Sequence, residues 1–287
     1  MNELIFFEKI IKERIWGLEY WLVSAHENGD TVIKNGEYKG KTLSWLWNNK
    51  RDLFGKFDSD DFPLLVKTID AKDDLSVQVH PNDGYAELHE NGSKGKNETW
   101  SIMSCEPNGS IIIGHKASNI EEAEKMIEEN RWDDFLRTIS IKKGDIFQIA
   151  PGTVHAIKKN TRLMEIQQNS DITYRLYDYN RMQNGKRRQL NIEKSLDVIV
   201  APYVEPDNYV TDRDNGVVTC QYYRVDRYEI KGAMTFDFNE YFKVIGVVEG
   251  KGLADGIAIN EGDAFIVSAG DGQYTIEGEI TILITYI

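Results

Sequence analysis

The sequence is poor in cysteine and proline. Its 287 residues include two cysteines, Cys105 and Cys220, and six prolines. The two cysteines do not form a CxxC motif, so a disulfide framework is not indicated and a reducing compartment, the cytoplasm, is expected. The scarcity of proline excludes a proline-rich linker between domains.

Long apolar runs and an excess of positive charge are also lacking. No window of about 18 apolar residues occurs, which excludes a transmembrane helix, and Met1–Ile15 mixes apolar with charged residues, unlike a signal peptide. The formal net charge is -13, which excludes nucleic acid and anionic membranes as partners. A small anionic substrate stays compatible, because a local cluster of Lys and Arg can oppose the global charge.

Residues that favour strands are abundant: the chain has 14 Tyr, 11 Phe and 6 Trp. Strands are predicted at residues 64–69, 75–80, 98–105, 110–113, 145–149 and 161–168, with a turn at 81–84. A helical segment is predicted near 118–137, where Ser118 and Glu121 have the spacing of a capping box. A further short helix is predicted to follow Asn191 as its N-cap.

The character of the chain changes after about residue 205. The remaining residues, 205–287, read as evenly spaced strands with glycine turns and contain no histidine. They predict a smaller β domain without a histidine metal site, following a first domain over residues 1–204. The segments 144–147 (Gly-Asp-Ile-Phe) and 262–265 (Gly-Asp-Ala-Phe) resemble each other, as expected of two related β-barrels.

Gln78 and His80 are the first candidates for metal binding. Residues two apart on a strand project from the same face, so both side chains can reach one ion. His155 follows a Pro-Gly turn, which fixes its direction, and Glu98 stands two residues after Lys96 at the start of a predicted strand. A carboxylate from a neighbouring strand and a distant histidine would complete a site for zinc, which accepts both donor types.

A basic segment runs from Lys158 to Arg188. It contains eight basic and three acidic residues and is therefore locally +5 in an acidic chain. Such a segment is either an ordinary solvated face or a lip that faces an anion near the metal. Arginine suits the second role, because its planar fork matches phosphate oxygens.

Four segments together resemble the type I mannose-6-phosphate isomerases in their short bacterial form. They are 75–81 (LSVQVHP), 95–100 (GKNETW), 151–156 (PGTVHA) and 173–179 (TYRLYDY). The resemblance implies a mainly β chain with a cupin-type jelly-roll barrel, a short helical insertion and a second, smaller C-terminal β-sandwich or jelly roll. It also implies a metal-dependent enzyme that interconverts mannose 6-phosphate and fructose 6-phosphate through an enediol.

The resemblance also implies site residues. The metal ligands become Gln78, His80, Glu98 and His155, holding one divalent ion, zinc before other metals. The catalytic residues become Arg175, Lys96, Glu165 and Asp171.

We expect Glu165 to transfer the proton, with Asp171 as second candidate. Lys96 is expected to assist ring opening or to stabilise the enediolate, whose charge Arg175 would also meet. Lys67 and Arg181 are candidates for the substrate phosphate.

Two alternatives remain open at this point. The motifs of this family specify the metal and the isomerisation machinery better than they specify the stereochemistry at C2 of the sugar. An isomerase or epimerase of another phosphosugar is therefore the first alternative. The segment 14–21, shorter than the family's usual N-terminal motifs, is compatible with a non-catalytic sugar-binding or regulatory cupin. The expected partner is a small phosphosugar, and the expected state is a monomer or weak homodimer.

Overall fold

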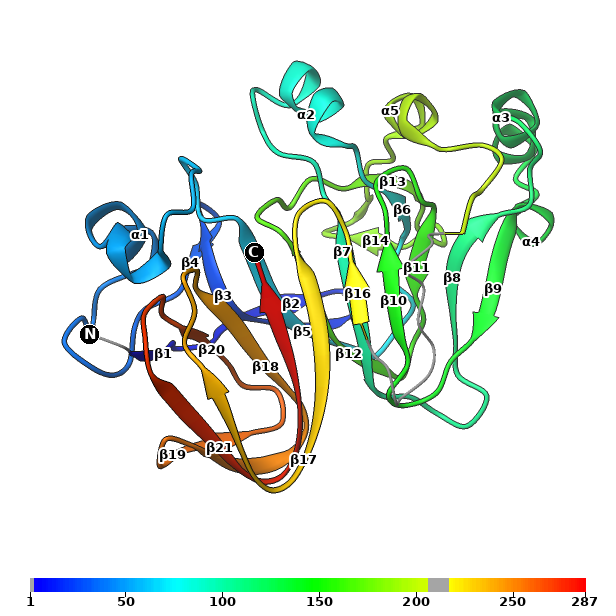
Figure 1. Ribbon diagram of the computed structural model, residues 1–287. Coiled ribbons are helices and arrows are strands. Elements are labelled where there is room, and N and C mark those ends of the chain that lie inside the picture. Colours follow the sequence, from blue (N-terminus) through cyan, green and yellow to red (C-terminus); the bar gives the residue numbers. More distant parts are fainter. Residues whose placement is uncertain (1–2, 206–216) are drawn as a thin grey trace.

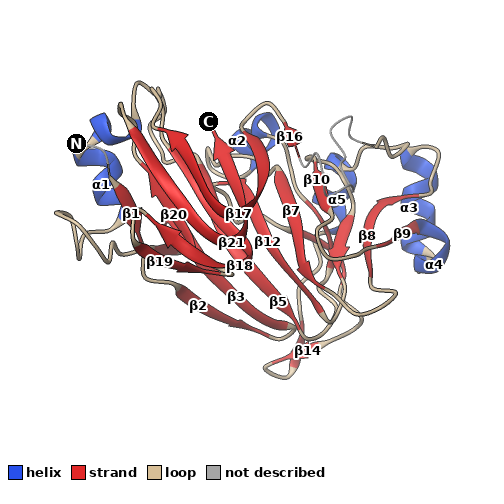
Figure 2. Cartoon of the chain, turned by 60° about the horizontal axis from the view of Figure 1, so that its bottom comes forward, coloured by secondary structure: helices blue, strands red, loops and turns tan. Residues whose placement is uncertain are grey.

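Sheets make up most of the computed structural model, which describes residues 3–205 and 217–287. Within those residues the strands form two seven-stranded sheets, a five-stranded sheet and one isolated hairpin. Figure 1 shows the sheets side by side across the molecule, and Figure 2 shows the helices at the margins of the strands.

The central seven-stranded sheet has the antiparallel order β10-β7-β12-β5-β3-β2, with β4 paired to β3. Its strands are β2 Ile10–Arg14, β3 Gly17–His26, β4 Gly29–Asp30, β5 Leu64–Ala71, β7 Glu98–Ser104, β10 Ile146–Ile149 and β12 Thr161–Gln168. The predicted strands at 64–69, 98–105, 145–149 and 161–168 are therefore confirmed.

The five-stranded sheet faces the central sheet and has the order β13-β6-β11-β8-β9. Its strands are β6 Val77–Val79, β8 Ser110–His115, β9 Leu136–Ser140, β11 His155–Ile157 and β13 Tyr174–Tyr177, and the hairpin β14 Met182–Gln183 with β15 Lys186–Arg187 follows β13. Trp100 and Phe147 of the central sheet pack with Ile111 and Ile113 of this sheet in one apolar cluster. The two sheets thus enclose the core of the predicted barrel.

Helices cover the outer side of the five-stranded sheet. They are α2 Asp83–His89, α3 Ile120–Glu128, α4 Trp132–Phe135 and α5 Ile192–Val198. In residues 3–205 and 217–287, no helix has the length and apolar character needed to cross a membrane. The predicted helical segment near 118–137 and the helix after Asn191 are confirmed.

Two local predictions were wrong, one of a turn and one of a helix start. Residues 81–84 do not form a simple turn, because Asn82 caps α2 by accepting a hydrogen bond from the Tyr85 backbone N–H at 2.9 Å. Helix α3 begins one residue later than predicted, since Asn119 is its N-cap and accepts from the Glu122 N–H at 2.8 Å. Ser118 instead donates its hydroxyl to the Glu122 carboxylate at 2.6 Å.

The other seven-stranded sheet has the order β1-β20-β18-β21-β17-β16, with β19 paired to β18. Its strands are β1 Leu4–Phe6, β16 Val217–Thr219, β17 Arg224–Asp237, β18 Lys243–Ala254, β19 Ile257–Asn260, β20 Ala264–Val267 and β21 Gln273–Tyr286. Strand β1 comes from the opposite end of the chain and pairs with β20. The division into domains at 204/205 stays a prediction, and residues 206–216 lie outside the described residues.

The repeated Gly-Asp-x-Phe segment forms the same turn twice. Asp145 accepts a hydrogen bond from the backbone N–H three residues before it, and Asp263 does the same, both at 2.8 Å. Phe147 and Phe265 are fully buried in the strands that follow. The sequence similarity therefore reflects equivalent turns in the two parts of the chain.

A shared aromatic core joins the central sheet to the C-terminal sheet. The elements α1 Leu43–Asn49 and η1 Arg51–Phe54 contribute Trp47 and Phe54 to it. Phe242 lies 5.3 Å from Phe54 and 5.4 Å from Phe62, measured between ring centroids, and is fully buried. The two parts of the chain thus share apolar burial through Phe242.

We expect Phe242→Ala to lower the free energy of unfolding by about 3–5 kcal/mol, because it leaves a cavity in this core. Urea denaturation followed by fluorescence measures the change. Tyr241→Ala is the matched control, since Tyr241 is 39% exposed and should cost less than about 1 kcal/mol. Equal losses in the two variants would contradict a shared core at Phe242.

Candidate metal and active site

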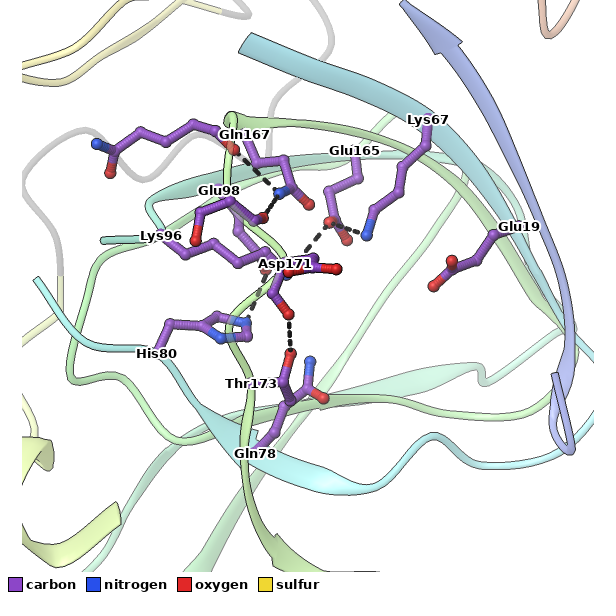
Figure 3. Close-up of polar contacts among 12 residues, drawn as sticks. Glu19, Lys67, Gln78, His80, Lys96, Glu98, Glu165, Gln167, Asp171 and Thr173 are labelled. Atoms are coloured by element: carbon purple, nitrogen blue, oxygen red, sulfur yellow. Dashed lines mark hydrogen bonds and ion pairs between the residues drawn. The ribbon is translucent and has the colours of Figure 1, made fainter. Parts of the chain in front are cut away.

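One cavity of about 590 Å³ opens between the central and five-stranded sheets. Its walls carry predicted site residues from β5, β6, β12 and β13, together with Lys96 just before β7. Figure 3 shows Lys67 reaching Glu165, with Lys96, Glu98, His80 and Gln78 gathered nearby. Ser76 and Gln78 lie on the cavity wall, and His80, just after β6, lies beside Glu98, as expected for alternate residues of an extended segment.

His80, Glu98 and His155 form a buried group whose donor atoms all lie within 4.8 Å of one another. His80 Nε2 lies 3.2 Å from one Glu98 oxygen, and His155 Nε2 lies 3.7 Å from the other. The Gln78 amide nitrogen lies 3.2 Å from His155 Nε2, because Gln78 and His155 are paired across β6 and β11. The structure therefore brings all four predicted metal ligands together.

The second ring nitrogen of each histidine is held by the backbone. His80 Nδ1 donates to the Ile172 carbonyl at 2.8 Å, and His155 Nδ1 donates to the Thr153 carbonyl at 2.9 Å. A carbonyl oxygen only accepts, so each Nδ1 carries the proton and each Nε2 keeps its lone pair. Burial, followed by the nearby Lys96 charge, lowers the pKa of His80 to about 3, and burial also lowers the pKa of His155.

These donors fit a divalent metal ion. His80 Nε2 is a buried atom without a hydrogen-bond partner in the described part of the chain, and the Glu98 oxygen that faces it is in an ion pair with the Lys96 ammonium at 2.6 Å. Two neutral imidazole nitrogens face a carboxylate, and all of these atoms carry lone pairs that repel one another. A bound cation would remove this repulsion. The fit rests on this donor set and on the fixed orientation of both rings.

A row of alternating charges crosses the central sheet and ends at this group. We call it the charge row, and its members in order are Arg14, Glu19, Lys67, Glu165, Lys96 and Glu98. The closest atoms are 3.0 Å apart for Arg14–Glu19, 2.8 Å for Lys67–Glu165, 3.9 Å for Glu165–Lys96 and 2.6 Å for Lys96–Glu98. Glu19 and Lys67 interact through their charges. Each cation in the row therefore stands beside a carboxylate.

Glu165 is the member of the row best suited to move a proton. It is buried directly across from Lys67 in the β5–β12 pair. The Trp100 indole N–H lies 3.1 Å from an oxygen of Glu98 and 3.1 Å from an oxygen of Glu165, so it links the two carboxylates. Burial, followed by the charge of Glu98, raises the pKa of Glu165 to about 7, which suits a general base near neutral pH.

The other predicted catalytic residues also line the cavity. Lys96 is almost fully buried beside Glu98, whereas Asp171 has a side chain that is 43% exposed and lies 2.7 Å from the Asn28 amide nitrogen. Arg175 stands opposite Gln78 in the β6–β13 pair. The structure thus brings Lys96, Glu165, Asp171 and Arg175 to one space, and their catalytic roles stay predictions.

The two residues predicted to bind phosphate have different surroundings. Lys67 lines the cavity, but its ammonium group is paired with Glu165 at 2.8 Å. Arg181 is absent from the cavity wall and is paired with Asp178 and, at 3.4 Å, with Asp73. The structure therefore does not bring Lys67 and Arg181 together.

Sequence reasoning missed several residues in and beside the cavity. Trp100 had an available signal, because it stands two residues after Glu98 and therefore on the same strand face. Arg14 and Glu19 meet across the β2–β3 hairpin, and Arg188 belongs to the basic segment without any mark that separates it from its neighbours.

Tyr223 connects the C-terminal sheet to the strands of the site. It precedes β17, is almost fully buried, and donates its hydroxyl to the Ile166 carbonyl at 3.0 Å. The Thr99 hydroxyl donates to the Tyr223 hydroxyl oxygen at 3.2 Å, and the Tyr223 hydroxyl also lies 3.4 Å from the Asn97 carbonyl. Tyr223 therefore holds the backbone beside both Glu98 and Glu165.

Comparison with known proteins identifies similar sequences and structures. Residues 10–108 match the family described as "Phosphomannose isomerase type I, catalytic domain", and residues 214–287 match "Mannose-6-phosphate isomerase, cupin domain". The mannose-6-phosphate isomerase ManA of Bacillus subtilis is 40% identical over 314 aligned positions, which cover 100% of this chain and 99% of that protein.

Solved structures agree with the sequence matches. A crystal structure of a mannose 6-phosphate isomerase from Bacillus subtilis has a TM-score of 0.93 at 38% identity, covering 99% of both chains. A putative mannosephosphate isomerase from Archaeoglobus fulgidus has a TM-score of 0.80 at 23% identity, with 99% of this chain and 97% of that chain covered, and supports the fold alone.

Proposed function

This chain belongs to the type I phosphomannose isomerase family, and we propose that it interconverts mannose 6-phosphate and fructose 6-phosphate. The observation that carries the proposal is the placement of the His80–Glu98–His155 group directly behind the cavity wall, where Lys96 pairs with Glu98 and Trp100 links Glu98 to Glu165. An aldose–ketose isomerase needs a cation beside the substrate oxygens and a proton carrier beside the two carbons. This cavity offers residues for both.

We propose that Gln78, His80, Glu98 and His155 hold one zinc ion. When bound, the ion supplies a Lewis acid that polarises the carbonyl and hydroxyl oxygens of the open-chain sugar. The Gln78 amide nitrogen now faces His155, and a half-turn of the amide presents the oxygen, the atom of this group that binds cations. Support for zinc comes from the mixed imidazole and carboxylate donors.

We propose that Glu165 carries the proton between the two reacting carbons. Its carboxylate removes the proton from C2 of the aldose, giving an enediol, and returns a proton to C1 of the ketose, while a second proton passes from O2 to O1. Lys67 and Trp100 hold the carboxylate in place through contacts of 2.8 and 3.1 Å. Asp171 remains the second candidate for this step.

Lys96 and Arg175 are proposed to stabilise the negative charge that develops on the enediol oxygens. Both are cationic, and both line the cavity near Gln78 and Glu165. Donors that are already fixed in place lose little free energy in reorganising during the reaction. Lys96 is also placed to assist opening of the sugar ring.

The proposal is tested by an isomerase assay on mannose 6-phosphate with zinc measured in the same sample. We expect turnover and about one zinc ion per chain. Other hexose and pentose phosphates in parallel assays test the sugar preference. Faster turnover of another phosphosugar, or binding of mannose 6-phosphate without turnover, would contradict the proposal.

We also propose that the chain works in the cytoplasm as a monomer or weak homodimer. The formal charge of -13 and the low cysteine content support this setting. Light scattering at several protein concentrations measures the oligomeric state directly.

A further inference from the structure

Two arginines of the cavity stand outside the charge row. Within the row, Arg14, Lys67 and Lys96 each have a carboxylate partner. Arg175 and Arg188 line the same cavity but belong to the other wall, which β13 and the segment after β15 form. Their charge is therefore not balanced by the row.

The side-chain contacts of Arg175 are uncharged. Its guanidinium donates to the Ser76 hydroxyl at 3.3 Å and to the Gln189 carbonyl at 2.9 Å. Arg188 lies 3.4 Å from Asp178, a carboxylate that Arg181 contacts more closely. One carboxylate thus serves both Arg181 and Arg188.

The surroundings disfavour the charges of Arg175 and Arg188 as they stand. Burial, followed by repulsion from Arg188, lowers the pKa of Arg175. Burial also lowers the pKa of Arg188, helped by Arg181 and Arg14 and opposed by Asp178. Guanidinium groups stay protonated in proteins, so the lowered pKa values indicate repulsion that an anion would relieve.

Arg188 is held over the cavity by backbone contacts. Asn191 accepts a hydrogen bond from the Arg175 N–H at 3.1 Å, and its own N–H donates to the Arg175 carbonyl at 2.8 Å. The neighbouring Gln189 carbonyl binds the Arg175 guanidinium. The segment that carries Arg188 is therefore fixed against β13, and its arginine is a built part of the cavity wall.

We propose that Arg188, with Arg14 from the facing wall, binds the phosphate group of the substrate. Among residues 3–205 and 217–287, Arg14 donates Nε and Nη2 to Glu19 and has no partner for Nη1, and Arg188 donates Nη1 alone, to Asp178. Two such forks match the oxygens of a phosphate dianion. The sugar carbons then point along the cavity toward Glu165 and the metal ligands.

This inference rests on the proposed function and assigns a phosphate site to it. Lys67 and Arg181 stay predictions for the same role. Both cations already have a carboxylate partner, since Lys67 pairs with Glu165 and Arg181 pairs with Asp178. Arg188 differs from them because Arg181 holds their common carboxylate more closely, and because Arg188, unlike Arg181, lines the cavity.

The test is Arg188→Met, assayed with mannose 6-phosphate and with inorganic phosphate as a competitive inhibitor. We expect KM and the inhibition constant of phosphate to rise by about 10- to 100-fold, as for loss of a hydrogen-bonded charge. The value of kcat should fall less than KM rises, because the reacting carbons are at the other end of the cavity. Arg188→Lys should recover part of the affinity, since it keeps the charge and loses the fork.

Arg187→Met is the matched control, because it removes the same charge from an exposed position on β15. It should leave KM and phosphate inhibition unchanged. A wild-type chain without turnover of mannose 6-phosphate contradicts the proposed function. Turnover by the wild type, with KM and phosphate inhibition unchanged in Arg188→Met or equally changed in Arg187→Met, overturns the phosphate site alone.

Discussion

His155→Ala is expected to reduce isomerase turnover by about a thousandfold or more and to release the metal. His155 is fully buried at the start of β11, and its Nε2 is fixed toward Glu98 by the Thr153 contact. Alanine removes one donor from the group and leaves Glu98 and His80 without a third strong ligand. Turnover and metal content, measured on the same preparation, check the result.

His89→Ala is the control for this prediction, because His89 is an exposed histidine at the end of α2. It should keep full activity and its metal. Treating the wild type with a chelator should abolish turnover, and adding zinc should restore it. Full activity of His155→Ala with no bound metal would contradict a metal-dependent reaction.

Glu165→Gln should lower kcat by about a hundred- to ten-thousandfold, the range for loss of a general base. Glutamine keeps the shape of the side chain and can still accept from Lys67 and Trp100, but it cannot take the proton from C2. Exchange of the C2 hydrogen with solvent, followed by NMR in deuterium oxide, should be lost with the turnover. KM should change much less than kcat.

Asp171→Asn is the comparison that decides between the two carboxylates. Asp171 is exposed and bonded to Asn28, so we expect less than about a tenfold loss. A large loss in Asp171→Asn with normal exchange in Glu165→Gln would assign the proton transfer to Asp171.

The pH dependence gives an independent view of Glu165. A base must be deprotonated, so kcat/KM should fall as the pH drops through its pKa, which burial and Glu98 raise to about 7. A metal ion bound to Glu98 would offset the charge of that carboxylate and so lower the pKa of Glu165. We therefore expect kcat/KM to fall at or below this pH. This part of the profile should disappear in Glu165→Gln.

The grouping of the proposed metal ligands was predicted from local signals together with the family resemblance. Alternation along β6 placed Gln78 beside His80, and the Pro-Gly turn set the direction of His155. The partner of Lys67 was not predictable in this way. Lys67 meets Glu165 only through the register of β5 with β12, and a strand pattern alone does not fix which strands pair.

Local signals also failed where two neighbouring residues are chemically alike. Ser118 and Asn119 can both cap a helix, and the backbone conformation at Asn119 decides between them. Likewise Arg181 and Arg188 look equivalent in the basic segment. They differ because Arg181 lies three residues from Asp178 and pairs with it, whereas Arg188 returns to the cavity after the β14–β15 hairpin.

Tyr223 links the C-terminal sheet to the strands that carry Glu98 and Glu165. Its hydroxyl contacts the Thr99 side chain and the Ile166 carbonyl, which adjoin the proposed metal ligand Glu98 on one strand and the proposed proton carrier Glu165 on the other. If these roles hold, the spacing between metal and base depends in part on a sheet that contains neither. Sequence change in that remote sheet is therefore a route by which related enzymes can adjust their rate while every residue of the cavity stays the same.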